Sequence, residues 1–326
     1  MYRKSAILAV TALAVLSATP NAASAAANEC KLSRIAEFEM IREPDGKIAV
    51  AVSLNGAQHR MLLATSSINS AVMRDFADSN HIPQKHLDQN VHVYIAGGEA
   101  EMYGTIDSLT LGSGTGSGLR MIVAPGYYPV DPAVVGMLGT DILGNFDVEF
   151  DFAAGKIRLF SNDHCPNIGA YWAAKYAELP IDLKQLGKPL SQWTLDGKPV
   201  SVSFDTSAAH SIMPMTVATE KFGLDTGSPG VEAAGNDAAG LPVYRYRFRS
   251  LAADGIAVNN PLVALYDSRS QQERCDGKTR FGHRWQQTTT CYGQGDLALG
   301  LQELSKLHLY FAYKEKVIYF TAADAH

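Results

Sequence analysis

Two stretches of the chain repeat each other and decide its fold. Residues 46–70 read GKIAVAVSLNGAQHRMLLATSSINS, and residues 187–211 read GKPLSQWTLDGKPVSVSFDTSAAHS. Aligned without a gap, they share the following identities: Gly46/Gly187, Lys47/Lys188, Leu54/Leu195, Gly56/Gly197, Thr65/Thr206, Ser66/Ser207 and Ser70/Ser211. So many matches in so short a window indicate an internal repeat.

Each copy has the pattern of a β-hairpin. An alternating strand leads into Asn55-Gly56 in the first copy and into Asp196-Gly197 in the second, and another hydrophobic strand follows. Asn-Gly and Asp-Gly are the favoured residues of a two-residue hairpin turn. The second strand runs directly into a Thr-Ser turn, so we expect these turns to present side chains from a rigid strand end.

A second repeated block closes each half of the chain. Leu138-Gly139 matches Leu299-Gly300, and the longer second spacing is explained by a polar insertion at 267–291. Between the blocks, residues 91–105 have the pattern of a hairpin around two glycines, and residues 243–251 alternate aromatic residues with arginines. Neither half alternates strands with helices, so we expect an all-β chain.

The composition fits two domains and export from the cytoplasm. With 326 residues, of which 46% are hydrophobic and 19% charged, the chain can form two ordinary cores.

Residues 1–25 combine Arg3 and Lys4, a short apolar run and the small residues 23–25, which is typical of a secretory signal peptide. We therefore expect a periplasmic or secreted protein without a membrane span. Loss of Arg3 and Lys4 takes the net charge from −5 to −7, which gives no reason to expect nucleic acid as a partner.

The four cysteines predict disulfides rather than a metal site. An even number in an oxidising compartment indicates two bonds, and four cysteines allow three pairings. We favour Cys30–Cys165, which brackets one copy of the repeat, and Cys275–Cys291, which closes the polar insertion. A zinc site is the alternative, but the chain has no C-x-x-C or H-x-x-x-H spacing. We expect neither a metal nor a cofactor.

The Thr-Ser turns and the glycine blocks together resemble the aspartic peptidases, in particular the bacterial retropepsin-like form with two lobes in one chain. In each lobe of that family, two hydrophobic residues precede Asp, Thr or Ser, Gly and a small residue, and a hydrophobic-hydrophobic-Gly block follows later. Here VSFDTSAAHSIM with LALGLQEL fits the second lobe, and MLLATSSINSAVM with GMLGTDIL fits the first. The resemblance covers most of the mature chain, including residues 170–180, which are similar to the connection between the family's lobes.

The resemblance implies two pseudo-symmetric barrel lobes with a cleft between them. Its boundaries here are a signal peptide at 1–25, an N-terminal lobe at 28–165, a connection at 166–186 and a C-terminal lobe at 187–326. It implies a catalytic role for Asp205, a structural role for the site residues Thr65, Thr206, Gly139 and Gly300, and a substrate-binding flap at Gly97 and Gly98.

Two departures from the family pattern bear on activity. Ser66 and Ser207 stand where the family usually has glycine, and Ala64 stands where the first lobe would supply its aspartate. Two carboxylates a few ångströms apart share one proton and act as base and acid together. With Asp205 alone, we expect a monomeric protein that binds a peptide or unfolded polypeptide and hydrolyses it weakly or not at all.

The alternative is an active aspartic endopeptidase in which Asp205 works with a second carboxylate. Asp141 is one candidate, but the resemblance implies that it begins the short helix after Gly139, where an acid often has a turn role. A second Asp205 from another chain would need a face that the first lobe already occupies. Two weaker patterns predict no site. Residues 112–118 lack the Lys-Ser/Thr of a phosphate loop. The spacing of His81, His86 and His92 fits no familiar metal site.

Overall fold

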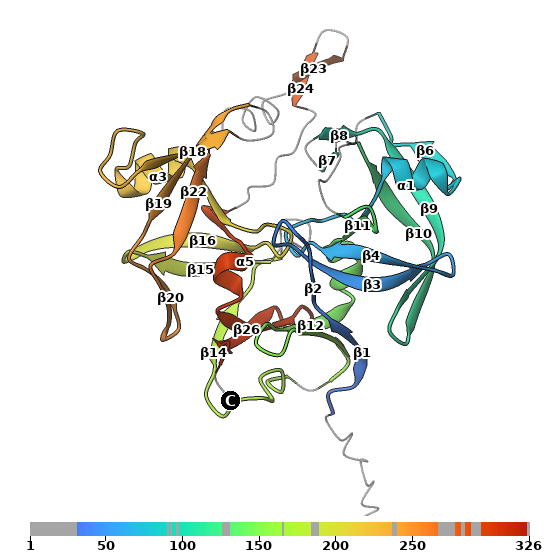
Figure 1. Cartoon of the computed structure of the whole chain (residues 1–326), viewed down its shortest axis with the longest axis horizontal. Coiled ribbons are helices and arrows are strands. Elements are labelled where there is room, and N and C mark those ends of the chain that lie inside the picture. The colour runs from blue at the N-terminus through green and yellow to red at the C-terminus, as the bar shows by residue number, and fades with distance from the viewer. Residues whose placement is uncertain are drawn as a thin grey trace, which may run out of the picture. The chain divides into compact units, whose positions relative to one another are not determined.

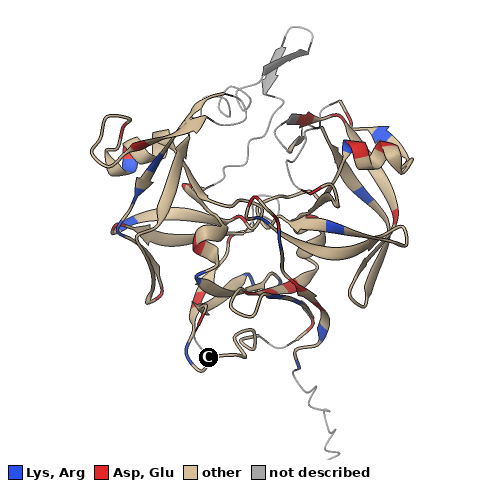
Figure 2. Ribbon diagram, in the orientation of Figure 1, with Lys and Arg blue, Asp and Glu red and all other residues tan. Residues whose placement is uncertain are grey.

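The computed structural model describes residues 31–324, except 90, 92, 96–97, 126–130, 165, 184–188, 237–239, 267–277, 282–283 and 288–294. The predicted signal peptide, the two predicted disulfides with all four cysteines, Gly97 and most of the polar insertion therefore lie outside the described residues. Within the described part, no helix is long and apolar enough to cross a membrane. Acidic and basic residues are interspersed over the strands of both halves (Figure 2).

The first half of the chain forms an eight-stranded sheet, six strands of which close into a barrel (Figure 1). We call it the first barrel. Its strands, in sheet order, are β2 (Ile41–Arg42), β3 (Ile48–Leu54), β4 (Ala57–Leu63), β11 (Val134–Leu138), β5 (Ala71–Met73), β10 (Gly114–Ala124), β9 (Met102–Leu111) and β6 (Gln84–His86). The additional pairing of β3 with β9 closes the barrel.

The second half forms a nine-stranded sheet with the same core topology. Its strands, in sheet order, are β18 (Glu232–Asn236), β19 (Pro242–Arg247), β22 (Leu262–Tyr266), β17 (Ser211–Pro214), β25 (Leu297–Leu299), β16 (Lys198–Phe204), β15 (Leu190–Leu195), β20 (Ser250–Ala253) and β21 (Ile256–Asn259). In both halves a hairpin leads to a strand that pairs in parallel with the glycine-block strand: β4 with β11, and β16 with β25. The predicted hairpin turns are present, since Asn55-Gly56 and Asp196-Gly197 all have positive φ.

A six-stranded sheet joins the two halves, and we call it the bridging sheet. Its strands, in sheet order, are β1 (Arg34–Glu39), β13 (Lys156–Ser161), β12 (Phe146–Asp151), β26 (Leu307–Ala312), β27 (Val317–Ala322) and β14 (Ala177–Pro180). The pair β12–β26 brings one strand from each half together at its centre (Figure 1). Phe311 of β26 contacts Phe150 and Phe204 with ring centroids 5.9 and 5.3 Å apart, so one hydrophobic core runs through both halves and the bridging sheet.

Four short helices and two small hairpins complete the described structure. The helices are α1 (Arg74–Ser79), α2 (Thr140–Leu143), α3 (Met215–Phe222) and α5 (Leu301–Leu304). The hairpins are β7 (Val93–Ile95) with β8 (Gly98–Ala100), and β23 (Lys278–Phe281) with β24 (Arg284–Gln287). The hairpin predicted at 91–105 is therefore present but shorter, because residues from Met102 onward belong to β9. The all-β prediction is confirmed.

The strand predicted at 243–251 is interrupted. β19 ends at Arg247 and β20 begins at Ser250, because Phe248 turns its ring into the core, where it is 1% exposed. Of the predicted arginine stripe, Arg245 pairs with Glu232 and Arg249 with Asp196. The segment 112–118 is a turn at Gly112-Ser113 followed by the start of β10, as its pattern predicts.

Candidate functional site

Two turns of the same shape meet at the junction of the two halves. The first turn (Ala64–Ser67) follows β4, and its Ser67 N–H donates to the Ala64 carbonyl over 2.9 Å. The second turn (Asp205–Ala208) follows β16, and its Ala208 N–H donates to the Asp205 carbonyl over 3.3 Å. Both begin directly after a buried strand, so the strands fix the positions of the turns.

The threonines of the two turns bind each other across the junction. The Thr65 hydroxyl donates to the Phe204 carbonyl over 2.5 Å, and the Thr206 hydroxyl donates to the Leu63 carbonyl over 2.8 Å. Each hydroxyl also accepts the partner threonine's N–H, over 3.2 and 3.3 Å, and the two Oγ1 atoms are 3.3 Å apart. Both residues are 0% exposed. This crossed network is symmetric and holds the two turns in a fixed relation.

The glycine blocks pass immediately beneath the turns. The Gly139 N–H donates to the Ser70 hydroxyl over 2.9 Å, and the Gly300 N–H donates to the Ser211 hydroxyl over 3.0 Å. A Cβ at Gly139 would lie 2.6 Å from the Asn69 carbonyl carbon, and one at Gly300 would lie 2.3 Å from backbone atoms of His210. No side chain fits at either position, which explains why both copies of the block carry glycine.

Ala64 and Asp205 occupy equivalent backbone positions but differ in chemistry. The Ala64 N–H donates to Leu138 and the Asp205 N–H donates to Leu299, both over 2.9 Å. Asp205 Oδ1 accepts the Ser207 N–H over 2.9 Å and the Ser207 hydroxyl over 2.6 Å, which orients the carboxylate. In the described part of the chain, its recorded partners include no second carboxyl group. The site therefore offers one oriented carboxylate opposite a buried methyl group.

Serine is compatible with the backbone at the third position of each turn. Neither Ser66 nor Ser207 is among the described residues with positive φ. Because only a left-handed backbone would favour glycine there, the Cβ of either serine causes no strain. The departure from glycine is therefore conformationally neutral at both turns.

The other acids near the first turn are engaged elsewhere. Asp141 lies in the first turn of α2 and accepts the Ser70 N–H over 2.9 Å and the Ser70 hydroxyl over 2.6 Å. Burial raises the pKa of Asp141, although the hydrogen bonds from Ser70 oppose that shift. This is the turn role that its position predicts. At the equivalent place in the second half, His210 Nδ1 lies 2.9 Å from the Gln302 side-chain oxygen, so the recorded partner of His210 is Gln302 rather than Asp205.

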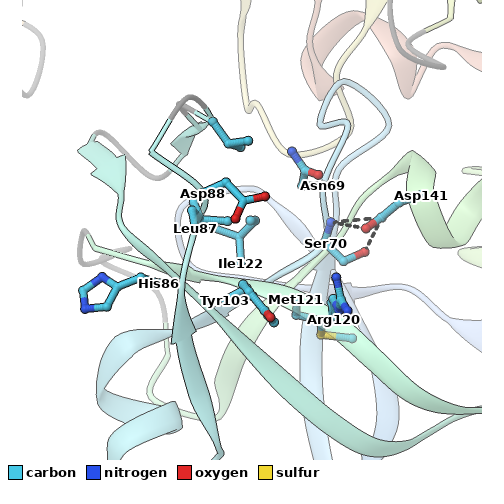
Figure 3. Close-up of a pocket in the computed structure, with 11 residues that line it drawn as sticks. Asn69, Ser70, His86, Leu87, Asp88, Tyr103, Arg120, Met121, Ile122 and Asp141 are labelled. Atoms are coloured by element: carbon cyan, nitrogen blue, oxygen red, sulfur yellow. Dashed lines mark hydrogen bonds between the residues drawn. The ribbon is translucent and has the colours of Figure 1, made fainter.

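A cavity of about 280 Å³ opens beside the first turn (Figure 3). Ser70 and Asp141 form one wall, and Leu87, Tyr103 and Ile122 contribute to the others. Arg120 also lines it, with its guanidinium 5.2 Å from the centre of the Tyr103 ring. The sequence contains no signal for this cavity, because its lining comes from five separate segments that only the barrel brings together.

The predicted flap hairpin lies close to the first turn, although its tip is not among the described residues. Gly98 begins β8 and Gly97 is not described, but Ile95 and Ala100 of that hairpin belong to the same buried hydrophobic cluster as Ala64 of the first turn. Of the three histidines at which no metal site is expected, His86 is exposed in β6 and lines the cavity, and His92 is not described. In comparisons with known proteins, no family model matches the chain and no curated protein matches it.

Proposed function

We propose that the chain is an exported, two-lobed protein of the retropepsin-like aspartic-peptidase type that binds extended polypeptide over the paired turns and hydrolyses it weakly or not at all. One observation carries this proposal: the crossed Thr65–Thr206 network joins two equivalent turns, of which one carries Asp205 and the other Ala64. The two lobes correspond to the first barrel and the nine-stranded sheet, and the bridging sheet joins them.

The chemistry of peptide hydrolysis gives the reason for weak or absent turnover. A carboxylate must take a proton from the attacking water while a neighbouring carboxylic acid protonates the carbonyl oxygen. Asp205 can accept the water proton, but Ala64 has no proton to donate. Loss of one such role reduces the rate by about 10²–10⁴-fold, which is about 3–5 kcal/mol of transition-state stabilisation.

Retention of the turn geometry without the second carboxylate supports a binding role. An extended chain would lie across the two turns, and the cavity beside Ser70 would accept one of its side chains. The lining of that cavity is mixed, with Leu87 and Ile122 beside Arg120 and Asp141. Such a site favours a partly polar side chain over a purely apolar one.

The alternative, an active endopeptidase, requires a second carboxyl group beside Asp205. The nearest sequence candidate, Asp141, is bound to Ser70 and to the Ile142 N–H within the first barrel. We therefore favour the binding role, and an active enzyme remains the outcome that would replace it.

Fluorescence anisotropy with a labelled, reduced and alkylated polypeptide tests the binding role. We expect saturable binding by the mature chain without cleavage. Ile122→Trp, which puts a larger side chain into the cavity, should weaken binding about 10-fold or more, equivalent to about 1.4 kcal/mol. Thr115→Trp, at an exposed position earlier on the same strand, is the matched control and should bind normally. No binding by the unmodified protein, or equal binding by both variants, would contradict the proposed site.

A further inference from the structure

One face of the bridging sheet carries buried ionisable groups instead of a hydrophobic core. In β12, Val148 and Phe150 point into the main core, while the alternate residues Asp147, Glu149 and Asp151 lie on the opposite face. Asp147 and Glu149 are at most 1% exposed. Burying charges in this way is costly unless each is paired and hydrogen-bonded.

The segment between the two halves covers this face. Trp172 stacks on His308 of β26 with ring centroids 4.0 Å apart. Gly169 approaches the rings of Tyr310 and Tyr319 so closely that a Cβ would lie 2.6–2.9 Å from them. The ionisable groups are therefore enclosed between the sheet and the connecting segment.

The group around Glu149 is fully compensated. Glu149 accepts hydrogen bonds from Arg158 over 2.7 Å and from Tyr171 over 2.7 Å, and His308 Nε2 lies 2.8 Å from it. Arg158 also pairs with Asp151 over 3.2 Å. A guanidinium already occupies the position that a cation would need, so this group serves as the internal comparison.

The neighbouring group around Asp147 is not compensated in the same way. Asp147 Oδ2 accepts the Tyr310 hydroxyl over 3.2 Å and lies 2.5 Å from His164 Nε2, but its Oδ1 is buried and has no hydrogen-bond partner among the described residues. Glu315 repeats the pattern: its Oε2 accepts from Tyr319 over 2.8 Å, and its buried Oε1 has no such partner in the same part of the chain. Burial raises the pKa of Asp147, although the interactions with His164 and Tyr310 oppose that shift.

The carboxyl groups of Asp147 and Glu315 face the two nitrogens of one imidazole, Asp147 through Oδ2 and Glu315 through Oε1. His164 Nδ1 is 3.6 Å from Glu315 Oε1, and its side chain is 2% exposed. Asp147, His164 and Glu315 can each offer one ligand atom such that all three lie within 4.8 Å of one another. Ligand atoms about 2.0 Å from a tetrahedral zinc ion are about 3.3 Å apart, so zinc binding would draw these three side chains closer together, by up to about 1.5 Å.

We propose that Asp147, His164 and Glu315 form a binding site for a divalent cation, with Zn²⁺ as the ion that this donor set fits best. Two carboxylates and one imidazole are common zinc ligands, and water would complete the tetrahedron. A buried carboxylate oxygen without a donor is the kind of group for which a bound ion accounts. Because Asp147 and His164 belong to the first half and Glu315 to the second, the ion would tie the two halves together.

Isothermal titration of the EDTA-treated, extensively dialysed mature chain with Zn²⁺ in non-reducing buffer tests the site. We expect one strong binding event and a Tm that rises with Zn²⁺ concentration, since an ion that binds only the folded state stabilises it. Asp147→Asn and Glu315→Gln should each weaken binding by more than about 10-fold, the smallest effect usual even for a partner outside the ligand set. His308→Gln, in the compensated group, is the matched control and should bind Zn²⁺ as the unmodified chain does.

Glu315→Gln guards against a folding artefact, because Glu315 lies in the turn between β26 and β27 and is partly exposed. Its circular dichroism spectrum and metal-free Tm should stay close to those of the unmodified chain. The cysteines are present in every variant, so zinc bound by thiols would appear equally in all titrations. Absence of strong binding by the unmodified chain, or equal binding by all variants, would overturn the proposal and leave the unpartnered oxygens to buried water.

Discussion

Replacing Thr206 by valine tests whether the crossed threonine network holds the two halves together. Valine has nearly the same shape but no hydroxyl, so it removes the 2.8 Å bond to the Leu63 carbonyl and the 3.2 Å bond from the Thr65 N–H. The Thr65 N–H loses its recorded acceptor and the Leu63 carbonyl loses one donor, in a site that water does not reach, since Thr65 and Thr206 are 0% exposed. An unsatisfied buried group costs about 1–3 kcal/mol, so the variant should lose about 2–4 kcal/mol of unfolding free energy.

A loss of that size is a large share of the about 5–15 kcal/mol that stabilises a typical domain. Urea unfolding monitored by tryptophan fluorescence measures it through the shift in midpoint at constant slope. Thr206→Ser keeps the hydroxyl and should lose only about 1 kcal/mol, for the missing methyl group. Thr194→Val removes an exposed hydroxyl on β15 and should stay within about 0.5 kcal/mol of the unmodified chain.

A double-mutant cycle with Thr65→Val completes the test. The two hydroxyls lie 3.3 Å apart, so each single variant loses their shared interaction and the double variant loses it once. The double variant should therefore be about 1 kcal/mol more stable than the sum of the single effects predicts. If Thr206→Val costs less than about 0.5 kcal/mol, or if the two effects are strictly additive, the network does not join the halves as described.

Three further predictions follow from the same site. Gly300→Ala should cost about 1–3 kcal/mol of unfolding free energy, because its Cβ would lie 2.3 Å from the backbone of His210. Gly227→Ala is the control and should be nearly neutral, because the atom nearest to its Cβ, 3.6 Å away, belongs to the exposed Asp225 side chain. Thermal melts compare the two variants. Burial raises the pKa of Asp141 above its unfolded value, so the stability that its protonated form contributes is fully present below about pH 4 and is lost as pH rises through the folded pKa. Asp141→Asn should remove that part of the pH dependence of the urea midpoint, and an unchanged profile would contradict the shift. Ala64→Asp should produce a carboxyl pair that shares a proton, so its stability relative to the unmodified chain should fall as pH rises from about 4 to 7, and an equal difference at every pH would exclude such a pair.

Much of the fold was predictable because the repeat fixes local structure twice. The Asn55-Gly56 and Asp196-Gly197 turns have the positive φ values that their residues favour, and the strands beside them alternate as their sequences do. The interruption at Phe248 was not predictable, because alternation alone does not show where a strand leaves a sheet to bury a ring.

The candidate site divides in the same way. The positions of Ala64, Asp205 and the two threonines follow from the repeat, since equal offsets place them on equivalent strand ends. Compatibility of Ser66 and Ser207 with the turns depends on backbone angles that the sequence does not give.

The groups on the bridging sheet were also missed. The alternation of Asp147, Glu149 and Asp151 is visible in the sequence and is usually a sign of a solvated face. Here His164 and the connecting segment with Trp172 cover that face, and period-two patterning cannot reveal such long-range contacts.

The most direct test of the central claim is cleavage of a reduced and alkylated protein between pH 3 and 8 by the chain without residues 1–25, and by its Ala64→Asp and Asp205→Ala variants. We expect no measurable cleavage by the unmodified chain or by Asp205→Ala, and acid-dependent cleavage by Ala64→Asp, because only that variant has a carboxyl group on both turns. Cleavage by the unmodified chain that disappears in Asp205→Ala would contradict the account, because it would mean that Asp205 already has a catalytic partner.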